Sequence, residues 1–108
     1  MDTITYEDFK KLELRVAVIE SAAAHPNADR LYVLNIRVGD LKKTIVAGVR
    51  LHYKEEELVG KKIVVVNNLA PSVIRGVESQ GMLLAASNDT LLTIVTPDRD
   101  IPDGANVR

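Results

Sequence analysis

The sequence of 108 residues contains no cysteine and no tryptophan. The absence of cysteine excludes a disulfide framework, a thiolate zinc site and a cysteine nucleophile. The longest stretch without a charged residue, Ile63 to Ile74, is interrupted by asparagines and a proline. It therefore falls well short of the roughly 20 apolar residues that a membrane span needs. The acidic N-terminus lacks the apolar segment of a secretory signal. The sequence predicts no membrane segment, and a cytoplasmic location is expected.

Aromatic residues are also scarce, with three tyrosines and one phenylalanine. Proteins that hold single-stranded nucleic acid without sequence preference stack the bases on aromatic rings. Because such rings are few here, any RNA partner is expected to be folded and recognised through its shape, phosphates and 2′-hydroxyl groups. The two histidines, His25 and His52, lack partners at metal-ligand spacing. The sequence predicts no enzyme activity, no metal and no cofactor.

The charge is unevenly distributed, although the formal net charge is only −1. Residues 30–75 contain nine basic and four acidic side chains, whereas residues 1–29 and 76–108 are each acidic by three charges. This segregation allows one basic face on a soluble domain. Alternating solvated lysines and carboxylates would give the same composition. Four basic residues fall on or beside two predicted strands: Arg30, Arg37, Lys42 and Lys43.

The apolar pattern predicts one all-β domain over residues 1–108. A short helix is expected after the N-cap Thr5, ending near Lys11, with Ile4 packing against Phe9. A single helical turn is expected at 54–58, and the C-terminal extension is expected to be irregular. Strands are expected at 14–19, 31–38, 44–47, 63–66, 82–86 and 91–95. Five or six short strands favour a five-stranded Greek-key barrel, the OB-fold, over a sandwich of about seven strands.

Residues 68–82 connect two predicted core strands and are too long and too polar for a hairpin turn. A loop held by core strands is a common place for binding groups. One interpretation is purely structural: Asn68 closes a turn, Arg75 pairs with Glu78, and the glycines supply backbone freedom. The other interpretation assigns hydrogen bonds with RNA sugar or phosphate to Asn68 and Ser79. It assigns a phosphate contact to Arg75 and an apolar contact at the rim to Met82.

The same segment resembles a family signature. Asn-Leu-x-Pro from Asn68, followed by Arg-Gly-Val-Glu-Ser-Gln-Gly-Met from Arg75, is similar to the signature of the dimeric tRNA-binding domain family. That family includes free-standing tRNA-binding proteins and the C-terminal domain of many methionyl-tRNA synthetases. Further similar stretches are His-Pro-Asn-Ala-Asp-Arg-Leu at 25–31 and Ile-Val-Ala-Gly at 45–48, so that the resemblance covers nearly the whole chain.

The resemblance implies a non-catalytic OB-fold domain that binds the outer corner of the L-shaped tRNA. It also implies a homodimer, joined through the helix and the chain ends, that aids an aminoacyl-tRNA synthetase. The methionyl-tRNA synthetase catalytic domain is then a candidate partner. Two alternatives remain open: a chaperone-like binder of unfolded or exported polypeptides, and a dimerisation module that binds no nucleic acid. The predicted RNA-binding residues are Arg30, Arg37, Lys42, Lys43, Arg50, Asn68, Arg75, Ser79 and Met82.

The sequence departs from the family pattern where the loop commonly carries lysine, because these positions are Ala70 and Val73. Ala17 and Ala47 likewise replace a glycine and a serine that are frequent in the family. The loss of positive charge from the loop predicts weaker tRNA binding than that of a typical member, or a shift of the contacts to other cations. Those cations are Arg30, Arg37, Lys42 and Lys43.

Overall fold

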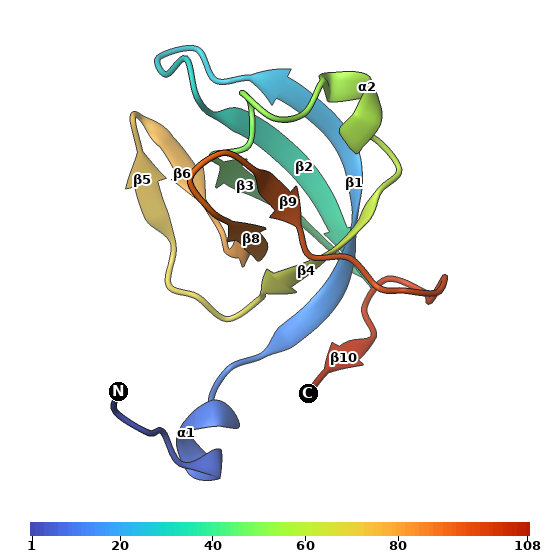
Figure 1. The fold of residues 1–108 in the computed structure, drawn as a ribbon. Helices are drawn as coiled ribbons and strands as arrows, with labels where there is room; N and C mark the ends of the chain where they lie inside the picture. The colour runs from blue at the N-terminus through green and yellow to red at the C-terminus, as the bar shows by residue number, and fades with distance from the viewer.

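The computed structural model describes all residues, 1–108, and shows a curled antiparallel sheet with a short helix beyond one end (Figure 1). The main sheet has the strand order β3-β2-β1-β4-β7, and β10 pairs with β1. Its strands are β1 (Leu14–Ala24), β2 (Tyr32–Val38), β3 (Leu41–Ala47), β4 (Lys62–Val66), β7 (Met82–Leu83) and β10 (Asn106–Val107). The predicted OB-fold is confirmed.

Two small hairpins and two single-turn helices complete the structure. The hairpins are β5 (Ser72–Ile74) with β6 (Val77–Ser79), and β8 (Ala85–Ser87) with β9 (Leu92–Ile94). The helices are α1 (Tyr6–Phe9) and α2 (Glu55–Leu58). Neither helix has the length or apolarity needed to cross a membrane.

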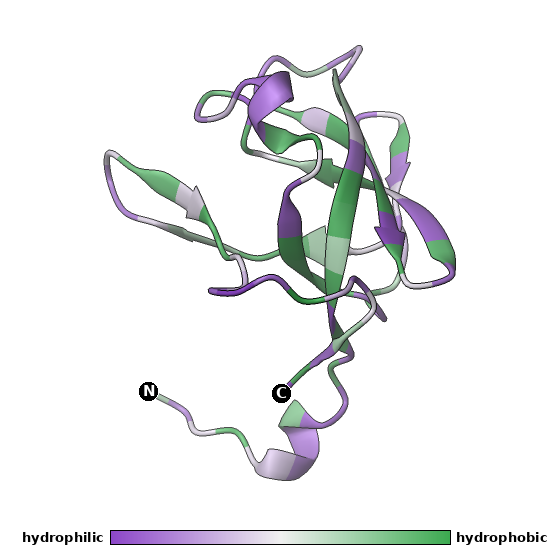
Figure 2. Ribbon diagram, turned by 90° about the vertical axis from the view of Figure 1, so that its right-hand side faces the viewer, coloured by the Kyte–Doolittle hydropathy of each residue, from purple (hydrophilic) through white to green (hydrophobic).

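The core follows from alternation along the strands. In β2, four apolar side chains at every second position are buried, and the side chains of Asn35 and Arg37 face outward. These buried residues are Tyr32, Leu34, Ile36 and Val38. Strand β4 is buried from Ile63 to Val66, and Leu58 of α2 is fully buried against the core. Figure 2 shows the hydrophobic colouring along the barrel strands and the hydrophilic colouring of α2 and the turns.

The barrel closes where Ser79 and Gln80 hydrogen-bond to the outer edge of β3. The backbone N–H of Gln80 donates to the Thr44 carbonyl at 2.8 Å, and the Gln80 side-chain carbonyl accepts from the Thr44 N–H at 2.9 Å. The Val46 N–H donates to the Ser79 hydroxyl at 2.9 Å. Gly81 follows with φ +141°, and a Cβ there would lie 2.9 Å from the Val66 carbonyl oxygen. Glycine is therefore required where the chain passes β4.

The loop expected at residues 68–82 contains the β5–β6 hairpin, which the sequence does not predict. Its two turn residues, Arg75 and Gly76, both have positive φ, +53° and +91°. A two-residue hairpin of this kind is usually signalled by Asn-Gly or Asp-Gly. Arginine is not typical of the first position, and the sequence therefore carried no clear turn signal.

In the N-terminal arm, residues 1–13, the helix is shorter than expected. The N-cap is confirmed, since the Asp8 N–H donates to the Thr5 hydroxyl at 3.1 Å. However, α1 ends at Phe9, and Ile4 is 69% exposed rather than packed on the helix. Figure 1 shows α1 standing away from the barrel. With no buried residue of its own, the helix depends on contacts elsewhere in the arm.

Asp103 fixes the C-terminal extension to the turn between β2 and β3. Its carboxylate accepts from the Gly39 N–H at 2.8 Å and from the Arg37 guanidinium at 3.3 Å. The hydrogen bond from Arg37, and further the N–H of Gly39, lower the pKa of Asp103 below its ordinary value. The following N–H, that of Gly104, donates to the Val16 carbonyl at 2.6 Å. The extension is thus attached by a group that must stay ionised.

This attachment predicts a loss of stability in acid. A carboxylate whose folded-state pKa is lowered stabilises the fold above its unfolded pKa, about 3.9 for aspartate, and this contribution disappears as the pH falls through the folded pKa. Asp103→Asn is therefore expected to unfold a few degrees below the wild type at neutral pH, with the difference vanishing in acid. Thermal unfolding followed by circular dichroism from pH 7 to pH 2 measures this. Asp40→Asn, at an exposed carboxylate without an ion pair, is expected to follow the wild type throughout. A constant Asp103→Asn difference at every pH would refute the ionic contribution.

Candidate nucleic-acid interface

The loop between β1 and β2 meets the tip of the β5–β6 hairpin through His25. This imidazole is only 3% exposed. Its Nδ1 accepts from the Asn27 N–H at 2.9 Å, so Nε2 carries the proton and donates to the Ile74 carbonyl at 3.0 Å. Both ring nitrogens are therefore used. The histidine joins two segments that are far apart in the sequence.

Arg75 is held by reciprocal hydrogen bonds with Asn27. Its guanidinium Nη2 donates to the Asn27 carbonyl at 3.1 Å, and the Asn27 amide donates to the Arg75 carbonyl at 3.3 Å. The positive φ of Arg75 is costly for a residue with a Cβ and persists only where the surroundings enforce it. The contacts of His25 and Asn27 supply that enforcement. They fix the guanidinium of Arg75 beside the β1–β2 loop.

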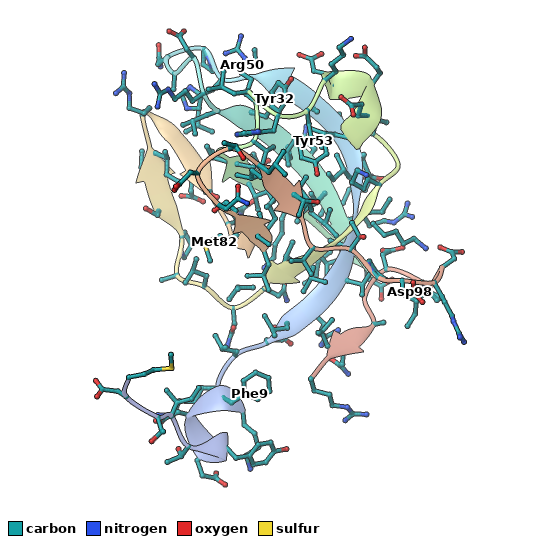
Figure 3. All side chains as sticks on the ribbon, in the orientation of Figure 1. Phe9, Tyr32, Arg50, Tyr53, Met82 and Asp98 are labelled. Atoms are coloured by element: carbon teal, nitrogen blue, oxygen red, sulfur yellow. The ribbon has the colours of Figure 1, made fainter.

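Three arginines meet at this end of the barrel, and we call the site that they form the arginine notch. Arg30 and Arg75 line a hollow of about 330 Å³ together with Ala28, Asp29 and Leu31. Arg50 donates from Nη1 to the Ala28 carbonyl at 3.3 Å, and Figure 3 shows it at the same end of the molecule. Arg30 has no hydrogen bond or ion pair within the protein.

The chemistry of the arginine notch suits a phosphate group. Guanidinium groups present paired N–H donors that match the oxygens of phosphate, and they stay charged at every physiological pH. Asp29 is the one carboxylate in the lining of the hollow. The notch therefore offers two lining cations and a third alongside, against a single negative charge.

Arg37 and Lys42 lie elsewhere, beside each other across β2 and β3. Arg37 pairs with Asp103 at 3.3 Å and with Glu20 at 3.4 Å, and Lys42 lies 3.8 Å from Glu20. The hydrogen bond from Arg37 to Asp103 raises the pKa of the arginine. These two predicted RNA contacts are therefore largely neutralised by nearby carboxylates and are not part of the arginine notch.

Lys43 and Asn68 both support the segment that leads from β4 into the hairpin. Lys43 donates from Nζ to the Asn67 carbonyl at 2.7 Å. The Asn68 side chain accepts from the Glu13 N–H at 2.8 Å and donates to the Lys11 carbonyl at 2.7 Å. Asn68 thus attaches the N-terminal arm to the barrel. Both the oxygen and the nitrogen of its side-chain amide already have a hydrogen-bond partner within the protein.

Ser79 has an internal role in place of the expected RNA contact. It is 4% exposed, and its hydroxyl accepts from the Val46 N–H and donates to the Gly81 carbonyl at 2.9 Å. Because the hydroxyl is buried and its one donor is already used inside the protein, it is not available to hydrogen-bond to RNA. Met82, by contrast, is 46% exposed, as a rim contact requires.

The sequence alone did not indicate the role of His25 and Asn27. The His-Pro-Asn run is typical of a turn, but the hairpin tip that it contacts, at Ile74 and Arg75, is distant in the sequence and is brought close only by folding.

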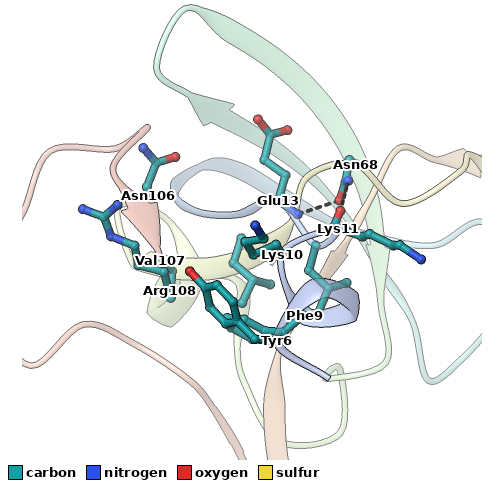
Figure 4. Close-up of a pocket in the computed structure, with 11 residues that line it drawn as sticks. Tyr6, Phe9, Lys10, Lys11, Glu13, Asn68, Asn106, Val107 and Arg108 are labelled. Atoms are coloured by element: carbon teal, nitrogen blue, oxygen red, sulfur yellow. Dashed lines mark hydrogen bonds between the residues drawn. The ribbon is translucent and has the colours of Figure 1, made fainter. Parts of the chain in front are cut away.

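A second hollow, of about 610 Å³, lies between the N-terminal arm and the C-terminus. Figure 4 shows Tyr6 and Phe9 of α1 facing Val107 and Arg108, with Asn68 bonded to Glu13 at the side. The ammonium group of Lys10 lies 5.3 Å from the centre of the Tyr6 ring. Tyr6 and Leu12 line this hollow and are exposed, and Ile4, elsewhere in the arm, is exposed as well.

This chain is similar to known proteins over nearly its whole length. The family model described as "Putative tRNA binding domain" matches residues 14–106. The methionine–tRNA ligase of Pyrococcus horikoshii is 46% identical over 108 residues, which are 100% of this chain and 15% of that protein. The chain thus spans a small part of this relative.

Solved structures show the same likeness. A MetRS-related protein from Pyrococcus horikoshii has a TM-score of 0.93 and 32% identity, with 100% of both chains covered. The chaperone CsaA from Bacillus anthracis has a TM-score of 0.90 and 27% identity, with 99% of this chain and 100% of that chain covered. On the basis of the family model, the identities and the shared fold, this chain belongs to the tRNA-binding domain family.

Proposed function

We propose that this domain is a non-catalytic, structure-specific tRNA-binding module that acts in the cytoplasm. The arginine notch carries the proposal, because Arg30 and Arg75 line one small hollow and Arg50 is hydrogen-bonded to Ala28 at its edge. In this proposal, the arginine notch binds backbone phosphates at the outer corner of the tRNA. The scarcity of aromatic residues supports recognition of shape rather than stacking along a single strand.

The domain also acts as a homodimer in this proposal. The exposed apolar side chains of the N-terminal arm would be covered by a second copy at the hollow beside the C-terminus. Asn68 would then support the dimer by holding the arm in place. The dimer serves an aminoacyl-tRNA synthetase by raising the local concentration of tRNA. The similarity to methionine–tRNA ligases makes the methionyl-tRNA synthetase catalytic domain the proposed partner.

A titration tests tRNA binding, and sedimentation of the complex tests its stoichiometry. Mixed folded tRNA is titrated with the domain at two salt concentrations, with single-stranded RNA of equal length as competitor. The expected result is binding that weakens steeply with salt, because bound phosphates release counterions, and that the single strand competes for poorly. Sedimentation of the complex is expected to give two chains for each tRNA. Equal competition by the single strand would refute shape recognition.

A chaperone-like role is the second candidate, favoured by the similarity to CsaA from Bacillus anthracis. An unfolded, reduced polypeptide added to the same titration separates the two functions. If the polypeptide bound with little dependence on salt and tRNA did not bind, the chaperone role would replace our proposal. Dimerisation without binding of either ligand would indicate a purely structural module.

A further inference from the structure

A third hollow, which we call the hairpin cleft, lies between β3 and the β5–β6 hairpin. Its volume is about 360 Å³, and none of the residues that line it carries a charge. Its walls are mainly apolar, with Ala47 and Leu83 on the barrel side and Leu69, Ile74 and Met82 on the other sides. Leu69 is 44% exposed and Met82 is 46% exposed, so two large apolar side chains of the lining are accessible to solvent.

The hairpin turns its uncharged face toward this cleft. Side chains alternate across a strand, so Ser72 and Ile74 face the cleft, and Val73 faces away. Glu78, the cross-strand partner of Val73, also lies on the outer face. The Glu78 carboxylate, the one carboxylate of the hairpin, is therefore directed away from any anion bound at the cleft.

A cation stands beyond one end of the cleft. Arg75 of the arginine notch directly follows Ile74 there. Lys43 donates to the Asn67 carbonyl, two residues before Leu69, but the nearby carboxylate of Glu13 offsets part of its charge. An apolar hollow with a positive charge at one end complements a ligand that has an apolar part next to a negative charge. A nucleotide within an RNA chain is such a ligand, because its base lies beside a phosphate.

We infer that the hairpin cleft takes one unstacked base of the bound tRNA, which deepens the function proposed above and rests on it. The faces of the base lie against Ile74 and the Met82 thioether, which makes favourable contacts with aromatic rings. Two polar groups without partners in the protein line the cleft and read the edge of the base: the Gly48 N–H and the Ser72 hydroxyl. Unpaired bases in loops are what proteins recognise in folded RNA beyond its shape. The domain thus binds phosphates at the arginine notch and a single base beside it.

The test fills the cleft without disturbing the core. Ala70 lines the cleft at an exposed position, and Ala70→Phe is expected to occlude it. Val73→Phe adds the same side chain on the outer face of the hairpin and is the matched control. Met82→Ala, which removes one wall, is the second variant should Ala70→Phe perturb the hairpin. Thermal unfolding of each variant checks that the fold is intact.

The measurements are affinity for mixed folded tRNA and chemical probing of a single tRNA transcript. Dimethyl sulfate and a carbodiimide together modify the pairing edges of all four unpaired bases. The wild type is expected to protect one unpaired base. Ala70→Phe and Met82→Ala are expected to lose that protection and about tenfold in affinity while keeping the salt dependence, as loss of one base contact should. Val73→Phe is expected to behave as the wild type.

The outcomes separate the two proposals. Unchanged affinity and unchanged protection in Ala70→Phe and Met82→Ala would overturn the base site and leave tRNA binding standing. Absence of tRNA binding by the wild type would overturn the proposed function and the base site with it. If an unfolded polypeptide displaced tRNA from the wild type, and bound Ala70→Phe poorly, the occupant would be an extended chain and the base site would be wrong.

Discussion

Replacement of Arg30 and Arg75 together by glutamate is expected to weaken the binding of folded tRNA by about a hundredfold, roughly tenfold for each phosphate contact. Both side chains line the arginine notch, and charge reversal there places carboxylates where phosphates would bind. The slope of log affinity against log salt is expected to become shallower by about two, one for each lost contact. All tRNA species should be affected alike. Titrations at several salt concentrations measure both quantities.

The single variants separate charge from structure. Arg30→Glu removes no hydrogen bond within the protein and is expected to lower affinity with no change in thermal stability. Arg75→Glu also removes the bond to the Asn27 carbonyl and is expected to loosen the hairpin tip. Arg99→Glu makes the same charge change on a side chain that is 94% exposed in the C-terminal extension. It should leave affinity nearly unchanged. An equal loss in Arg99→Glu would mean that net charge, rather than the arginine notch, governs binding.

Ser79→Ala is expected to destabilise the domain by about 2 kcal/mol and to leave tRNA affinity unchanged below the unfolding transition. The substitution removes the acceptor of the Val46 N–H and the donor to the Gly81 carbonyl, all in the interior. The cost is large because buried polar groups then lack partners. The bonds that close the barrel edge at β3 are weakened at the same time. Urea unfolding measures the free energy, and a titration at low temperature measures the affinity.

Ser87→Ala is the matched control, since Ser87 is exposed at the end of β8. A surface substitution of this kind is expected to change the free energy of unfolding by less than about 0.5 kcal/mol. A drop in tRNA affinity for Ser79→Ala, with stability unaltered, would restore Ser79 as an RNA contact and contradict its internal role.

Much of the fold was predictable because the side chains of a strand alternate between core and solvent. The spacing of Tyr32, Leu34, Ile36 and Val38 indicated the buried face of β2, and the structure confirms it. The helical turn at 54–58 was predicted from its charged run and is found as α2. The β5–β6 hairpin was missed because Arg75 occupies a turn position that normally signals itself with asparagine, aspartate or glycine.

The candidate site was predictable residue by residue but not as an arrangement. Charge and the family signature indicated Arg30, Arg50 and Arg75 separately. Nothing in a linear pattern showed that His25 and Asn27 would bring the hairpin tip to the β1–β2 loop. The same applies to Asn68 and Ser79, whose hydrogen-bond partners within the protein lie in distant segments.

The sequence by itself determined the fold class, the buried face of β2 and the lack of cysteine chemistry, since these depend on residue type and local spacing. The tertiary structure decided which cations remain available to a ligand. Glu20 and Asp103 neutralise Arg37, whereas the Arg30 side chain has no ion-pair partner. The sequence predicted both arginines as RNA contacts and did not distinguish them. The physical reason is that electrostatic and hydrogen-bond energies depend on distances between groups, and for segments far apart in the chain only folding sets those distances.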